Sequence, residues 1–155
     1  MGTLRDARLG AVELGSDGYG EASLGAGPWR PRLTVEWAGE LPAGEVDLVP
    51  GDPGALLERA LRFATDGGDE TVELFLSHHL REFAPEELEA IVGEGAAAGL
   101  EGLRAALEPI ALHVVAGAGP AELVVDLGFG QGVTEVVLAV RLDPSGRPLE
   151  VDAES

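Results

Sequence analysis

The sequence has no cysteine, and all ten of its basic residues are arginine, so lysine is absent as well. The missing thiols exclude disulfides, thiolate nucleophiles, cysteine zinc sites and iron–sulfur clusters. The missing lysine excludes a P-loop and Schiff-base chemistry. A chain of 155 residues nevertheless buries roughly 68 to 70% of its unfolded surface on folding, so it needs neither disulfides nor a structural metal.

Positive charge is also scarce, because 28 acidic residues outnumber 10 basic ones and give a net charge of -18. Such a chain repels phosphate backbones, so we expect no nucleic-acid partner. The acidity predicts a solvated surface, and a basic protein is the partner that it would favour. The first ten residues lack the apolar core of a signal peptide, and no later segment is long and apolar enough to cross a bilayer. We therefore predict a cytoplasmic protein with no membrane partner and no cofactor.

Short apolar patterns predict three strands in the first third of the chain, at Leu9–Leu14, Leu33–Trp37 and Glu45–Leu48. The loop Ala38–Gly44, which contains a proline, is expected to join the second and third strands as an antiparallel hairpin. The glycine-rich segment Gly15–Pro31 is predicted to be a mobile loop, because few of its side chains could anchor it.

The middle of the chain has the periodicity of helices. Asp52 and Pro53 are typical of an N-cap and a first turn, and apolar residues follow at helical spacing until Gly67. The next helix has the clearest apolar stripe, from Val72 to Phe83. Two further helices are predicted at Pro85–Val92 and Ala96–Leu107.

The last third of the chain predicts an antiparallel meander. The residue types of Asp143–Gly146 are those of a type I turn, so the strands on either side should form a hairpin. The sequence therefore predicts a single α+β domain over residues 1–155, in which an antiparallel sheet from N-terminal and C-terminal strands packs against three or four central helices. The expected C-terminal strands are Ile110–Val115, Leu123–Leu127, Val133–Leu142 and Leu149–Ala153.

The histidines are the first candidates for a metal site. Neighbours on a helix diverge by about 100°, so His78 and His79 cannot point at one ion together, whereas Glu82 shares a helix face with His78. The candidate metal ligands are therefore His78, Glu82 and His113. The alternative is that these histidines have no role in metal binding. In that case we expect His79 at the edge of the core, with its ring bonded to backbone, and His78 on the surface.

Catalytic motifs are missing from the sequence. No serine lies in a G-x-S-x-G elbow, and the alternating glycines Gly128, Gly130 and Gly132 are typical of a turn between strands rather than of a dinucleotide-binding loop. We therefore predict no catalytic residues and no bound cofactor.

The few aromatic residues offer candidates for partner binding. Trp29 and Trp37 flank the predicted strand Leu33–Trp37 and could anchor the core or a loop. An exposed Trp29 beside Tyr19 would instead mark a contact surface, because such side chains are enriched at binding hot spots.

Several segments together resemble a known family. They are F-L-S-H-H-L-R-E-F-A-P from Phe75 to Pro85, the strand piece Leu123–Asp126, and the closing L-A-V-R-L-D-P-S-G-R-P-L-E-V-D-A-E-S. With them, residues 33–155 resemble the bacterial family catalogued as domain of unknown function 2004. The resemblance implies a bacterial, cytoplasmic α+β domain with no assigned activity, and it transfers no site residues.

Two classes of function remain open from the sequence. The favoured hypothesis is a non-enzymatic acidic interaction protein, for example an inhibitor or immunity-type partner of a basic protein. The alternative is an enzyme or small-ligand binder that uses a metal on the His78 and Glu82 helix face. A homo-oligomer formed through an exposed edge strand is a further hypothesis.

Overall fold

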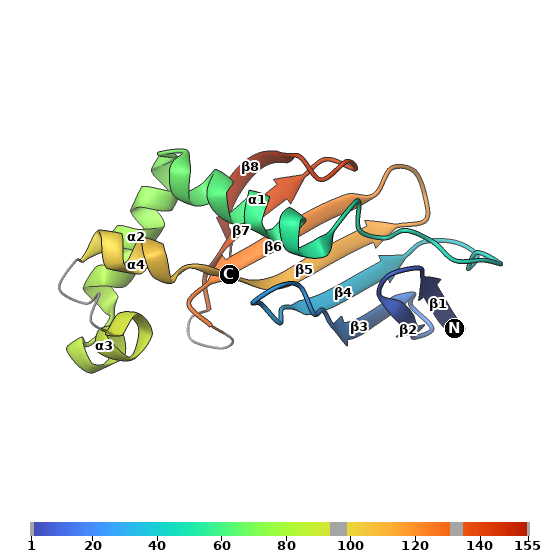
Figure 1. Ribbon diagram of the computed structural model, residues 1–155, viewed down its shortest axis with the longest axis horizontal. Helices are drawn as coiled ribbons and strands as arrows, with labels where there is room; N and C mark the ends of the chain where they lie inside the picture. The colour runs from blue at the N-terminus through green and yellow to red at the C-terminus, as the bar shows by residue number, and fades with distance from the viewer. Residues whose placement is uncertain (1, 94–98, 131–134, 155) are drawn as a thin grey trace.

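The computed structural model describes residues 2–93, 99–130 and 135–154. Within them, a six-stranded sheet packs against four helices, and a two-stranded sheet lies beside one edge (Figure 1). The strands are β1 (Gly2–Asp6), β2 (Gly10–Leu14), β3 (Tyr19–Ser23), β4 (Arg32–Trp37), β5 (Glu108–Ala116), β6 (Glu122–Gly128), β7 (Val137–Leu142) and β8 (Pro148–Glu154). The helices are α1 (Pro53–Asp66), α2 (Glu70–Glu82), α3 (Pro85–Val92) and α4 (Leu100–Ala106).

The large sheet has the strand order β3-β4-β5-β6-β7-β8, and β1 pairs with β2. The predicted α+β fold is confirmed, because N-terminal and C-terminal strands form one sheet and the helices come between them in the sequence. The predicted meander is also confirmed, since β5 to β8 are antiparallel neighbours. One pairing differs from a fully antiparallel sheet: β4 and β5 are parallel.

The core lies between the helices and one face of the sheet, as alternation along the strands predicts. Figure 1 shows α1 lying over the strands, with α2, α3 and α4 grouped at one end. The sheet residues that form this buried face are Leu33, Val35, Leu112, Val114, Leu123, Val125, Leu127, Leu138, Val140, Leu142 and Val151.

The helices begin where capping side chains satisfy free backbone N–H groups. The Asp52 carboxylate accepts a hydrogen bond from Ala55 N at 2.9 Å, and the Asp69 carboxylate accepts one from Thr71 N at 2.7 Å. Each such cap contributes about 1 kcal/mol to stability. None of the helices that the structure describes is long and apolar enough to cross a membrane.

The expectation of a loop over Gly15–Pro31 is wrong, because this segment contains β3, which pairs with β4. The strand was hidden in the sequence by its small residues. Gly20 is needed there, since a Cβ at this position would lie only 2.3 Å from the carbonyl oxygen of Glu13 on β2. After the strand, Leu24 and Ala26 are buried in the core.

The predicted strand Glu45–Leu48 and its hairpin with Leu33–Trp37 are also wrong. β4 lies inside the sheet with β3 and β5 on either side, so it has no free edge for a further strand. The segment instead runs beside β1, where Val46 N donates to the Arg5 carbonyl at 2.8 Å and its carbonyl accepts from Ala7 N at 3.1 Å.

Other boundaries differ by a few residues. β1 was not predicted, and the strand expected from Leu9 begins at Gly10. β7 begins at Val137, whereas residues 133 and 134 of the predicted strand lie outside the described ranges. α4 begins at Leu100, and residues 96–98 of the predicted helix are likewise outside them.

Candidate functional site

The helices cover one face of the six-stranded sheet, and the other face carries the side chains that point away from them. Because side chains alternate along a strand, these are the residues between the buried positions. We call this surface the open face. It consists of Tyr19, Glu21 and Ser23 on β3; Arg32, Thr34 and Glu36 on β4; Ala111, His113 and Val115 on β5; Glu122, Val124 and Asp126 on β6; Val137, Ala139 and Arg141 on β7; and Glu150, Asp152 and Glu154 on β8.

The open face carries a large excess of negative charge. Seven of its side chains are carboxylates and two are guanidinium groups. Each arginine lies near one carboxylate: Arg141 contacts Glu150 at 2.9 Å, and Arg32 lies 3.9 Å from Glu21. The remaining carboxylates leave the face negative as a whole.

Two pKa shifts on the open face arise mainly from single hydrogen bonds to carboxylates, one on β7 and one on β3. On β7, the hydrogen bond from Arg141 to Glu150, together with the charge of Glu150, raises the pKa of the guanidinium above its usual range. On β3, the hydroxyl of Tyr19 donates to Glu21 at 2.7 Å, and this hydrogen bond raises the pKa of the phenol.

The centre of the open face holds a chain of three hydrogen-bonded side chains. Nδ1 of His113 lies 2.6 Å from the Thr34 hydroxyl, and Nε2 lies 2.6 Å from a carboxylate oxygen of Asp126. The chain therefore joins β4, β5 and β6 and fixes the orientation of the imidazole.

A hydroxyl, an imidazole and a carboxylate are also the groups of a hydrolytic triad. In this chain Thr34 is only 6% exposed, so its hydroxyl is not presented to a substrate. No pattern in the sequence pointed to Thr34, because its position opposite His113 depends on the parallel pairing of β4 and β5. Asp126 could have been linked to His113 from the sequence, because they lie on consecutive antiparallel strands.

The structure separates the three candidate metal ligands. His78 and Glu82 lie on α2, which packs against β8, whereas His113 lies on β5, three strands away, and points to the open face. Across residues 2–93, 99–130 and 135–154, no three histidine or acidic side chains are grouped closely enough to hold a metal ion. A metal site on His78 and Glu82 alone stays a prediction.

His79 lies at the edge of the core with its ring bonded to backbone, as the sequence predicts for a structural histidine. It is 4% exposed, and its Nδ1 lies 2.8 Å from the carbonyl oxygen of Phe75, one turn earlier in α2. Its ring packs against Phe75, Phe83 and Phe129, with ring centroids 4.2 to 5.7 Å apart. His78 is exposed.

The two aromatic candidates for partner binding lie in different places. Tyr19 is 37% exposed and lines a hollow of about 390 Å³ on the open face, together with Trp37 and Glu36. Trp29 is half-buried on the helix side of the sheet and packs against the core. The structure therefore does not show the alternative of an exposed Trp29 beside Tyr19, and Trp37 is the aromatic residue that lines the hollow with Tyr19.

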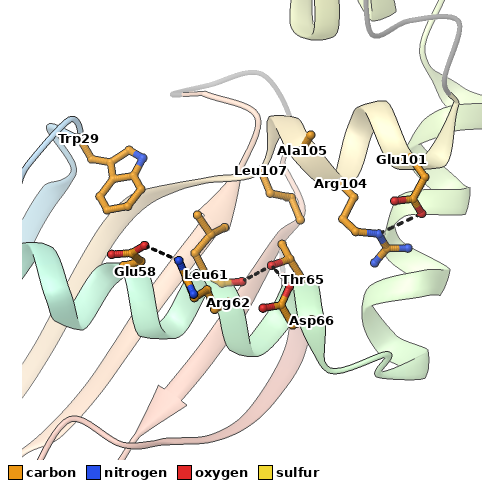
Figure 2. A pocket seen from close by; sticks show the side chains of 10 residues that line it. All are labelled: Trp29, Glu58, Leu61, Arg62, Thr65, Asp66, Glu101, Arg104, Ala105 and Leu107. Atoms are coloured by element: carbon orange, nitrogen blue, oxygen red, sulfur yellow. Dashed lines mark hydrogen bonds and ion pairs between the residues drawn. The ribbon is translucent and has the colours of Figure 1, made fainter.

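Figure 2 shows the cavity of about 300 Å³ that Trp29 lines between α1 and α4. Its charged residues bind one another, because Arg62 contacts Glu58 at 3.1 Å and Arg104 contacts Glu101 at 3.4 Å. Arg104 also contacts Glu73 at 2.6 Å. Since these ion pairs satisfy the arginines, the cavity offers no strong attraction to an anionic ligand.

No protein-family model, curated protein or solved structure matches this chain. The resemblance to the domain of unknown function 2004 family therefore stays a prediction, and the functional argument rests on the open face itself.

Proposed function

We propose that this protein is a non-enzymatic interaction protein that binds a basic polypeptide through the open face. The observation that carries the proposal is the charge of this face, with seven carboxylates against two guanidinium groups on the side of the sheet that α1 to α4 leave uncovered. A negative surface of this kind attracts a positively charged partner and speeds its encounter, more strongly at low salt.

The middle of the open face fits a protein partner better than a small ligand. Ala111 and Ala139 lie on either side of Asp126 and are only 3% and 6% exposed, so the larger side chains around them would make the contact with a partner. The hydrogen bonds of His113 hold its ring in one orientation, which lowers the entropy lost when a partner packs on it. Carboxylates surround this centre and would form salt bridges at the rim.

An inhibitor or immunity-type protein for a basic toxin or nuclease is one concrete form of this function. Inhibition by a covering protein needs affinity and charge complementarity but no reactive group on the inhibitor. A cytoplasmic location and a bacterial origin belong to the same proposal.

The test compares two variants with the same change in net charge. The open-face variant combines Glu36→Arg with Glu122→Arg. The control variant combines Glu82→Arg on α2 with Glu89→Arg on α3. The four glutamates are all exposed in the unaltered protein. A basic protein captured at low salt is purified and titrated against each variant. We expect the open-face variant to bind at least about tenfold more weakly and the control to bind like the unaltered protein. Equal loss in both variants contradicts the proposal, because it shows attraction by total charge only.

A further inference from the structure

β8 is an edge strand of the six-stranded sheet. β8 pairs with β7 on one side, and no other part of the chain that the structure describes pairs with its second side. Of the seven residues of β8, only Val151 is buried. At the opposite edge, β2 closely approaches β3, where Gly15 N donates to the Tyr19 carbonyl at 2.9 Å. β2 therefore hinders the addition of a strand at the start of β3, where Gly20 lies against Glu13 on β2.

The side chains of β8 define what such a strand must carry. Glu150, Asp152 and Glu154 point to the open face, and Val151 and Ala153 alternate with them, whereas Leu149 lies at an irregularity in the pairing with β7. Side chains that lie opposite each other on neighbouring strands interact directly, and opposite charges stabilise the pair. An incoming strand should therefore have basic residues on the open face and apolar residues on the other.

The same pattern disfavours a second copy of this chain. Antiparallel pairing of β8 with β8 of another molecule keeps the two open faces on one side, so the carboxylates of both strands lie opposite one another. Like charges in this position are destabilising, and acidic edge residues are a common protection against self-association. The edge thus selects a basic strand over its own copy.

An apolar hollow next to β8 adds a contact for one side chain. It has a volume of about 300 Å³ and is lined by Ala153 on β8 and by Leu74, Phe75 and His78 on α2. Leu74 is 63% exposed, so its side chain is available for contact. Because Ala153 is short, an apolar side chain on an added strand could pass over it and contact Leu74.

We propose that β8 accepts an extended segment of the basic partner as an additional strand, with alternating basic and apolar side chains. This inference rests on the proposed function and specifies how the partner is recognised. Backbone hydrogen bonds to β8 supply affinity, the carboxylates select the basic residues, and the hollow beside Ala153 and Leu74 selects one apolar residue. Pro148 begins the strand and has no N–H to donate, so pairing extends over residues 149–154.

The probe is a blocked peptide of the same length as β8, in which arginine and isoleucine alternate. Its binding to the full chain is measured by fluorescence anisotropy, and hydrogen exchange reports which amides it protects. One control peptide has the same composition with arginines and isoleucines in separate blocks. A second control is the alternating peptide N-methylated at every residue, which keeps the charge and removes the backbone donors.

We expect the alternating peptide to protect amides of β8 and leave those of β3 unchanged. Both control peptides should bind at least about tenfold more weakly. Asp152→Arg should weaken binding more than Glu36→Arg, which makes the same charge change on β4. Leu74→Asn should weaken it more than Phe63→Asn, a matched change at an exposed position of α1.

Equal binding of the alternating and N-methylated peptides would overturn the strand addition while leaving the proposed function intact, since charge alone would then account for attraction. Protection of β3 instead of β8 would also overturn it. Absence of binding by every peptide rejects the added strand, and the capture experiment with the Glu36 and Glu122 variant then decides separately whether a basic partner uses the open face.

Discussion

Nε2 of His113 lies 2.6 Å from a carboxylate oxygen of Asp126 in the middle of the open face. The other ring nitrogen is bonded to the hydroxyl of Thr34, so one imidazole connects three adjacent strands. The Asp126 side chain is 16% exposed and that of His113 is 30% exposed, which means that these groups are only partly accessible to water. Their hydrogen bonds therefore replace water contacts that the folded chain removes.

Replacement of His113 by alanine is expected to destabilise the fold. The variant leaves the Thr34 hydroxyl and the Asp126 carboxylate without their partner in a partly buried place, which should lower the free energy of unfolding by roughly 1 to 3 kcal/mol. Urea denaturation measures the change. His78→Ala is the matched control, because His78 is exposed, and it should change the stability by less than about 0.5 kcal/mol. Equal effects of the two substitutions would show that the bonds of His113 contribute nothing.

Replacement of Asp6 is also expected to lower the stability of the fold. It is 3% exposed, and its two carboxylate oxygens accept hydrogen bonds from the backbone N–H groups of Arg8, Leu9 and Leu48 at 2.6 to 2.9 Å. Asp6→Ala leaves three N–H groups without an acceptor and should cost roughly 3 kcal/mol or more in thermal or urea denaturation. Asp6→Asn keeps one acceptor oxygen and should cost less.

Asp17 provides a control for this prediction. It also accepts a backbone hydrogen bond, from Tyr19 N at 3.1 Å, but it is exposed, so water can replace the lost acceptor. Asp17→Ala should therefore have a much smaller effect. If Asp17→Ala lost as much stability as Asp6→Ala, burial of the carboxylate would not determine how much stability is lost.

The parts of the fold that could be predicted from the sequence are those set by neighbouring residues. The apolar stripe of α2, the proline and glycine boundaries of α1 and α3, and the turn at Asp143–Gly146 all depend on contacts within a few positions. The parallel pairing of β4 with β5 depends on strands separated by the helices, and no local pattern encodes it. β3 was missed because its residues are mostly small or polar.

The candidate site shows the same limit. Acidity was evident from composition, but the gathering of carboxylates on one face depends on the registers of six strands. Tyr19 was identified as a candidate for partner binding, and the structure does place it on the open face. The companion of Tyr19 is Trp37 rather than Trp29, because β3 and β4 pair directly and the residues between them fold back to the helix side.

Tyr19 gives a direct optical test of the potential on the open face, since it is the single tyrosine of the chain. Its hydrogen bond to Glu21 raises the pKa of the phenol, so the ultraviolet absorbance of the tyrosinate should appear at a higher pH than in the unfolded protein. Glu21→Gln should lower the midpoint, and Arg32→Gln should raise it, because the charge of Arg32 favours the phenolate. Shifts in the same direction would contradict this assignment.

The sign of the corresponding stability change follows from linkage. Because folding raises the pKa of Tyr19, the hydrogen bond stabilises the fold fully below the pKa of the unfolded state, and this contribution is lost as the pH rises through the folded value. The difference in stability between the unaltered protein and Glu21→Gln should therefore shrink in strong alkali.

Asp143 lies in the hairpin between β7 and β8, and its contribution to stability should depend on pH in the opposite direction to that of Tyr19. Its Oδ1 accepts hydrogen bonds from the Ser145 hydroxyl at 2.6 Å and from the backbone N–H groups of Ser145 and Arg147 at 2.9 Å. The hydroxyl bond from Ser145 is the main cause that lowers the pKa of this carboxyl, followed by the backbone bond from Arg147. The turn is the one that the sequence predicts, with Gly146 N donating to the Asp143 carbonyl at 2.9 Å.

Because folding lowers the pKa of Asp143, the stabilisation is present above the pKa of the unfolded state and is lost as the pH falls through the folded value. An NMR titration of the Asp143 carboxyl should have its midpoint below the usual aspartate value, and Ser145→Ala should raise that midpoint. Asp143→Asn should lose stability relative to the unaltered protein at neutral pH and approach it in acid. Ser16→Ala is the control, since Ser16 is exposed in a different turn and should leave the titration unchanged. An unchanged midpoint in Ser145→Ala would mean that the backbone bonds alone hold the carboxylate.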